Sequence, residues 1–167
     1  MKKGFTMIEL IFVIVILGVL ASVAIPRLAA TRDDAEVAKA ATNLTTAVSD
    51  ITAYYTAKGK FESSAQSDFS KITNALTKNG KLNVKGSTTC VQVTLPTNAI
   101  GNAAASTSDT EVKLTLTFTP GADPVCKQLA KLPGIKTMCG VDDTTNSSAM
   151  VSSKCEIQIG GSGGIQF

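Results

Sequence analysis

An acidic residue, Glu9, lies inside a long apolar run at the start of the chain. It is the only charged residue between Phe5 and Ile25. At about 1.5 Å of rise per residue, a helix over this run would be about 31 Å long and could cross a bilayer. A carboxylate costs about 2.5 to 3.5 kcal/mol at the centre of a bilayer, and less toward the end of a span. Glu9 therefore predicts ion pairing with a cation in an apolar environment.

The apolar run could serve in three ways. It could be the core of a cleaved secretory signal, because two lysines precede it and residues 22–24 resemble a small-residue cleavage site. It could also be a plain membrane anchor, but neither of these roles explains Glu9. Cleavage after Gly4 does explain it, because the cut would leave an ammonium group on Phe5. That cation could pair with Glu9 of the same helix or of a neighbouring one.

Four cysteines lie in the second half of the chain, and none belongs to a CxxC pair of the kind found in zinc sites and thioredoxin-like proteins. An even number at wide spacing, downstream of a membrane segment, predicts two disulfide bonds formed in an oxidising compartment. Alternate residues of a strand share a face, so Cys155 lies with the apolar residues of its strand and Cys90 lies opposite those of its own. We favour Cys90 with Cys126 and Cys139 with Cys155. A bond between Cys126 and Cys139 is the closest alternative.

The composition offers little for catalysis. The chain has no His and no Trp, so it lacks the commonest general base and the commonest metal ligand. We find no nucleophile beside a base, and we predict no catalytic residue, no metal site and no cofactor. The formal net charge is +3, and Lys2 and Lys3 supply two of these charges. The rest of the chain is nearly neutral, which predicts no general affinity for polyanions.

The start of the chain combines several features at fixed spacing. Two lysines and Gly4 precede Phe5, Glu9 follows Phe5 by four residues, and the apolar run ends at Pro26. This pattern resembles the class III signal of type IV pilins and type II secretion pseudopilins, over roughly residues 1–60. The resemblance implies cleavage between Gly4 and Phe5 by a prepilin peptidase and N-methylation of Phe5. It also implies that Glu9 is needed for assembly.

The resemblance implies a structural subunit that polymerises through its N-terminal helix into a type IV pilus or a related filament. Its partners would be copies of itself, other pilins, the prepilin peptidase, an inner-membrane platform protein and an assembly ATPase. The alternatives are a pseudopilin of a type II secretion or DNA-uptake system, or a membrane-anchored or secreted binding domain with an ordinary signal peptide. Nucleic acid would be a partner only of a DNA-uptake pilus. The cysteines and the lack of Trp depart from the major pseudopilin pattern and favour a pilus subunit or a competence-type subunit.

Charge placement predicts the orientation in the membrane. Lys2 and Lys3 favour a cytoplasmic N-terminus by the positive-inside rule. The protein would then be a single-pass protein of the bacterial inner membrane with a periplasmic head, which becomes extracellular or periplasmic once assembled.

A single helix is predicted from Phe5 to about Lys58, with Gly59 as its C-terminal cap. Pro26 removes one hydrogen bond and predicts a kink where the apolar run ends. Beyond Pro26 an apolar stripe recurs at helical spacing, at Val37, Ala41, Leu44, Val48, Ile51 and Tyr55. A sheet is needed to cover this stripe.

Three segments alternate apolar and polar residues as half-buried strands do, at residues 90–95, 112–118 and 155–159. We expect them to pair antiparallel, which gives an α+β fold with a long N-terminal helix on a small sheet. A short helix is expected around Phe69 to Leu76, closed by Asn79-Gly80. Another is expected from Asp123-Pro124 to Pro133-Gly134, and residues 100–109 read as a loop.

These elements predict four parts. Residues 1–4 form a leader, residues 5–26 a membrane and assembly helix, and residues 27–58 an amphipathic helix that packs on the head. Residues 59–167 form the head, with the sheet and a disulfide-bonded C-terminal region.

Overall fold

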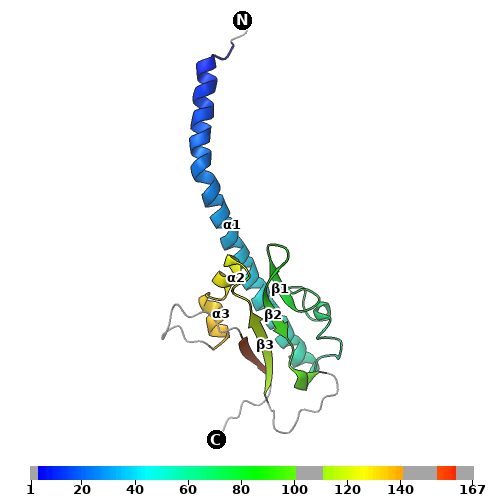
Figure 1. Ribbon diagram of the computed structural model, residues 1–167. Coiled ribbons are helices and arrows are strands. Elements are labelled where there is room, and N and C mark those ends of the chain that lie inside the picture. The colour runs from blue at the N-terminus through cyan, green and yellow to red at the C-terminus, as the bar shows by residue number, and fades with distance from the viewer. Residues whose placement is uncertain (1–3, 101–110, 141–153, 161–167) are drawn as a thin grey trace. The chain divides into compact units, whose positions relative to one another are not determined.

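The computed structural model describes residues 4–100, 111–140 and 154–160 (Figure 1). The chain divides into two compact units, residues 1–35 and residues 36–167. We call the first the N-terminal unit and the second the head. Helix α1 (Met7–Lys58) begins in the N-terminal unit and ends in the head.

Helix α1 ends where the sequence predicts. Gly59 adopts a φ of +69°, and its N–H donates to the carbonyl of Tyr55 at 2.7 Å. Glycine takes up this left-handed conformation without a steric penalty, so it caps the helix directly after Lys58. The helix continues through Pro26, whose missing N–H leaves one carbonyl without its usual donor. The kink expected there stays a prediction.

The buried face of α1 is turned slightly from the predicted stripe. Its centre consists of Val37, Ala40, Leu44, Ala47 and Ile51, all 6% exposed or less. Three residues of the predicted stripe lie at its edge and are only partly buried, namely Ala41, Val48 and Tyr55. The alanines at the centre carry little apolar signal, but their small side chains let another layer approach the helix closely.

The head contains a four-stranded antiparallel sheet in the order β1-β2-β3-β4. Its strands are β1 (Lys81–Val84), β2 (Thr88–Thr94), β3 (Val112–Phe118) and β4 (Lys154–Gly160). The last three are the predicted strands, and the α+β fold class is confirmed. Strand β1 was missed because its alternation of polar and apolar residues extends over only four residues. Within the head, α1 passes along one face of the sheet (Figure 1).

The register of the strands places their apolar residues on one face. Val93 pairs with Leu116, and Leu116 pairs in turn with Cys155. All three are 4% exposed or less, and they belong to one core cluster with the buried face of α1. On the opposite face Thr117 and Glu156 are exposed. One helix face and one sheet face thus close a single two-layer core.

The prediction of a helix around Phe69 to Leu76 is wrong. Only one turn of 3-10 helix forms, η1 (Phe69–Lys71). The chain then turns at Thr73, whose hydroxyl accepts a bond from Ala75 N at 3.1 Å and donates to Asp50 of α1 at 2.7 Å. The predicted stop at Asn79-Gly80 instead leads directly into β1.

The second short helix begins as predicted but ends earlier. In α2 (Pro124–Leu129), Asp123 accepts a hydrogen bond from Val125 N at 2.8 Å. The expectation that Pro133-Gly134 ends this helix is wrong, because Pro133 begins a separate helix, α3 (Pro133–Met138). Proline is common just after the end of a helix and also in the first turn of a helix, so the sequence alone did not decide between these two positions for Pro133. The remaining element is a short 3-10 helix, η2 (Thr97–Ala99), and the loop expected at 100–109 lies outside the described residues except for Ile100.

Candidate functional site

The first turn of α1 satisfies the carboxylate of Glu9. Its Oε2 accepts a hydrogen bond from the backbone N–H of Thr6 at 2.9 Å and another from the Thr6 hydroxyl at 2.6 Å. Thr6 precedes the helix, and Glu9 lies three residues further along, inside it. This is the arrangement in which an acidic side chain reaches back to an otherwise unbonded N–H at the helix start. Glu9 therefore stabilises the start of α1.

The role of Thr6 was missed in the sequence. The signal was present, because Thr6-Met7-Ile8-Glu9 has the spacing of a capping box. The sequence-based prediction treats Glu9 as a partner for a cation. The structure gives it hydrogen-bond donors within the chain, adjacent to the predicted cleavage point between Gly4 and Phe5. In the uncut chain the nitrogen of Phe5 is a peptide nitrogen and carries no charge.

The segment that follows Glu9 presents apolar side chains all round the helix. Among the described residues, every large apolar side chain that is strongly exposed lies between Phe5 and Leu28, and the exposed fractions there run from 42% to 92%. α1 is the one helix of the described chain that is long and apolar enough to cross a membrane. An exposed apolar surface of this extent needs lipid or other protein to cover it.

Both disulfide bonds are the ones that the sequence favours. Cys90 of β2 bonds to Cys126 of α2 with a Cα–Cα distance of 5.0 Å. Cys139, directly after α3, bonds to Cys155 of β4 with a Cα–Cα distance of 5.4 Å. The two bonds attach the short helices to the sheet, and they link parts of the chain 36 and 16 residues apart.

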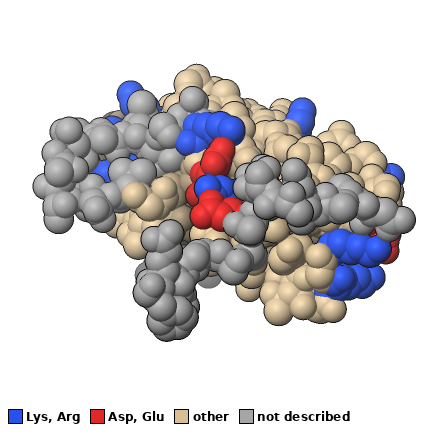
Figure 2. All heavy atoms as spheres, turned by 90° about the horizontal axis from the view of Figure 1, so that it is seen from below, with Lys and Arg blue, Asp and Glu red and all other residues tan. Residues whose placement is uncertain are grey.

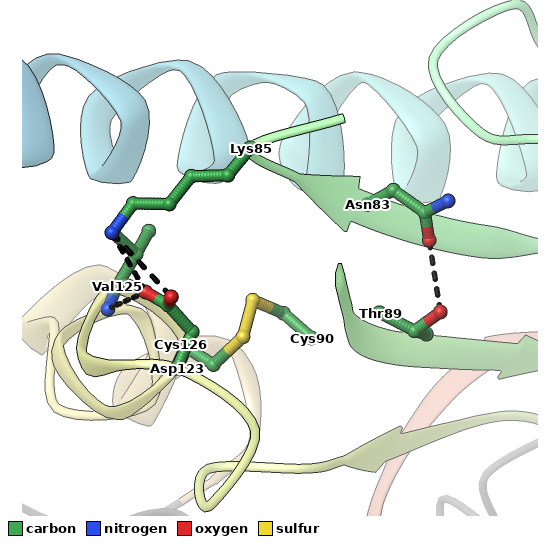
Figure 3. The surroundings of a disulfide bond; sticks show 7 residues. All are labelled: Asn83, Lys85, Thr89, Cys90, Asp123, Val125 and Cys126. Atoms are coloured by element: carbon green, nitrogen blue, oxygen red, sulfur yellow. Dashed lines mark hydrogen bonds and ion pairs between the residues drawn. A yellow bond between two sulfur atoms is a disulfide. The ribbon is translucent and has the colours of Figure 1, made fainter. Parts of the chain in front are cut away.

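An ion pair supports the first of these bonds (Figure 3). The Nζ of Lys85 lies 3.2 Å from a carboxylate oxygen of Asp123, the residue that caps α2. The hydrogen bond from Val125 N, together with Lys85, lowers the pKa of Asp123 below its usual value. Lys85 itself has a φ of +49°, in the tight turn between β1 and β2. The cap, the ion pair and the disulfide thus fix α2 against this hairpin.

The lysines of residues 58–85 have acidic neighbours. Among them, ion pairs join Lys58 and Lys71 to Glu62, Lys78 to Asp68, and Lys85 to Asp123. The exposed sheet face carries further pairs, Lys113 with Glu111 and Lys154 with Glu156. Figure 2 shows acidic and basic side chains together at the centre of one face of the molecule. Where lysines and carboxylates pair in this way, the local charge is largely balanced, which weakens attraction to a polyanion.

No metal site is visible in the described part of the chain. Across residues 4–100, 111–140 and 154–160, no group of three or more Cys, Asp or Glu side chains could hold a metal ion.

Comparison with known proteins agrees with this N-terminal site. Residues 1–25 match the family model described as the prokaryotic N-terminal methylation motif. Searches of curated proteins and of solved structures gave no match. The matched segment contains Gly4, Phe5 and Glu9 and ends at Ile25. At residues 1–25 the chain therefore carries the signature motif of type IV pilins and pseudopilins.

Proposed function

We propose that this protein is a structural subunit that polymerises through α1 into a type IV pilus or a closely related filament. The observation that carries the proposal is the methylation motif at residues 1–25, which ends in an exposed apolar helix. The motif implies self-assembly and processing by a prepilin peptidase. A helix with apolar side chains on every side can be stored in a bilayer and later bundled with its copies.

Processing would create the charge that assembly uses. Removal of residues 1–4 leaves an ammonium on Phe5, which is then N-methylated and keeps its positive charge. Thr6 holds the Glu9 carboxylate at the helix start. In an apolar filament core, the carboxylate and a Phe5 ammonium attract each other strongly, whereas either one alone would be penalised. We propose that Glu9 pairs with the Phe5 ammonium of a neighbouring subunit as it joins.

The other parts of the chain would serve the same purpose. Residues 5–26 would be the membrane and assembly helix, with residues 27–58 packing on a head of residues 59–167. The N-terminus would be cytoplasmic and the head periplasmic, where disulfide bonds form. An inner-membrane platform protein and an assembly ATPase would drive extraction from the membrane. We propose no enzymatic activity.

The mature N-terminus tests this proposal. We expect the intact mass of the purified protein to correspond to a chain that begins at N-methylated Phe5. A chain that begins at Ile25 would contradict the proposal and indicate an ordinary secretory signal. Filaments sheared from cells should contain the same processed chain.

Gly4 offers a matched control. A Cβ added at Gly4 would meet no atom within 4 Å, so Gly4→Leu should leave the fold intact. We expect this variant to keep residues 1–4 and to remain in the membrane without filaments. Normal processing of Gly4→Leu would mean that the cut is made elsewhere.

Among related filaments, the ion-paired lysines favour a role other than DNA contact. A type II secretion pseudopilus and a DNA-uptake pilus are the alternatives. Deletion of the gene that encodes this protein distinguishes the three kinds of filament. Loss of surface filaments, with normal protein secretion and normal DNA uptake, supports the pilus.

A further inference from the structure

The head has an open apolar pocket beside α1. Its volume is about 660 Å³. Ala41 and Thr45 of α1 form one wall, and Leu132, Ile135 and Met138 from α3 and the residue before it form another. A Cβ built on Gly134, at the start of α3, would meet nothing within 4 Å, so the space above this residue is open. Small residues on both walls make this pocket accessible to an inserted side chain.

The described chain also has an apolar surface without cover. All of its strongly exposed large apolar side chains belong to Phe5–Leu28. One molecule therefore has both an open apolar pocket and a helix with exposed apolar side chains. Two complementary patches at different places on one chain form a heterologous interface, and repetition of such an interface gives an open helical polymer.

We propose that the pocket between α1 and α3 receives an apolar side chain from the Phe5–Leu28 segment of a second copy. The inference rests on the proposed function, because it assumes polymerisation of this chain. The inference identifies the surface of the head that would receive the partner's side chain, and the N-terminal motif gives no information about that surface. The pocket would bury part of the apolar helix that leaves the membrane, and so would set the position of each new subunit along the filament.

Two threonines of α1 allow a matched test. Thr42 and Thr45 are both exposed, and each hydroxyl donates to the carbonyl four residues earlier, at 3.0 Å and 2.9 Å. Thr45 lines the pocket and Thr42 does not. A photoreactive benzophenone residue would be placed at either position in the full chain, and filaments sheared from cells would be irradiated. We expect cross-links from position 45 to residues 5–28 of another copy, at several times the yield obtained from position 42.

Mass spectrometry of the cross-linked peptides would decide the partner. Cross-links from position 45 to a lipid, to another protein or to a head residue would overturn the proposal. So would equal yields from positions 42 and 45.

A charge placed in the pocket provides a second measurement. We expect Thr45→Lys to lower filament yield by about tenfold or more, because the ammonium would have to enter an apolar contact, whereas Thr42→Lys should assemble like the wild type. The thermal midpoint of the detergent-solubilised full chain should be equal in the two variants. Normal assembly of Thr45→Lys, or equal loss in both variants, would overturn the pocket interface while the proposed function stands. Absence of filaments from wild-type cells would instead overturn the proposed function.

Discussion

Glu9 has two sets of partners at different stages of the proposed assembly. In the uncut chain the backbone and hydroxyl of Thr6 donate to its Oε2. These bonds reduce the penalty of holding a carboxylate in the edge of a bilayer, where unsatisfied polar groups are costly. After the proposed cleavage the Phe5 ammonium would become available. Hydrogen bonding explains how the residue is tolerated before assembly, and charge pairing explains how it would contribute afterwards.

Substitution of Glu9 separates these two contributions. Glu9→Gln keeps an oxygen that accepts from Thr6 but removes the charge that would compensate Phe5. We expect cleavage to continue and filament yield to fall by about tenfold or more, because the ammonium would be left unpaired in the filament core. Immunoblots of processed protein and sheared filaments would measure both. Thr6→Ser keeps both donors and serves as the control, and filament yield within twofold of the wild type in Glu9→Gln would contradict the pairing.

Gly80 is required for two reasons. Its φ is +72°, and a Cβ would lie 2.5 Å from the ring of Phe69, which is fully buried. Gly86 has a φ of +89° and open space around it, so it provides a control for the backbone conformation alone. We expect Gly86→Ala to cost about 1 kcal/mol of unfolding free energy and Gly80→Ala about 2 to 4 kcal/mol, because Phe69 must also move. Denaturant unfolding would measure the difference, and equal losses would show that the ring adjusts freely.

At the level of elements, the stability of α2 depends on the ionised form of Asp123. Its pKa is lowered mainly by the hydrogen bond from Val125 N, and Lys85 adds to this effect. A group whose pKa is lower in the folded chain stabilises it above the unfolded pKa, which is about 3.9 for Asp. That contribution is lost as the pH falls through the folded pKa. The cap of α2 should therefore weaken only in acid.

Thermal unfolding between neutral pH and strong acid would test this dependence. We expect the wild type to lose more stability than Asp123→Asn as the pH falls below about 4, because the amide can cap the helix but cannot titrate. At neutral pH, Asp123→Asn should be slightly less stable, since it loses the charge that pairs with Lys85. Identical pH profiles would show that Asp123 does not contribute in its ionised form.

The elements that the sequence predicted correctly have local causes. The C-terminus of α1 follows from Gly59, the start of α2 from Asp123, and β2 to β4 from period-two alternation. The elements that were missed depend on contacts distant in sequence. Phe69 of η1 is buried with its ring against Gly80, a contact between separate segments that no local pattern predicts.

The sequence predicted part of the candidate site and missed the rest. Glu9 was recognised because a charge in an apolar run is conspicuous, whereas Thr6 was overlooked in spite of its capping-box spacing. The faces of the two strands disfavoured only a bond between Cys90 and Cys155, and the pairing that we favoured is the one that forms. The α1–α3 pocket could not be predicted, because it requires Pro133 to begin a helix instead of ending one.

At the scale of the whole molecule, the core belongs entirely to the head. Every member of the buried cluster, from Val37 to Ile159, lies within residues 36–167. The strongly exposed large apolar side chains of the described chain all lie within the N-terminal unit. The two units therefore need different surroundings, an apolar one for the N-terminal unit and an aqueous one for the head.

A truncated chain of residues 36–167 should therefore fold without detergent. We expect a monomer with both disulfide bonds and with a thermal midpoint within a few degrees of that of the head in the full chain, because truncation removes no core residue. Size-exclusion chromatography and circular dichroism would show this. Aggregation of the truncated chain in its oxidised form would mean that the first 35 residues are needed to fold the head.

The bond between Cys139 and Cys155 also determines how the protein would respond to a protease. It joins two points on either side of residues 140–154. A single cut in that interval would leave both fragments covalently attached, so the product would keep its full mass on a gel without reductant and separate only after reduction. A nicked chain would therefore keep its two pieces together until a reductant opens the sulfur link.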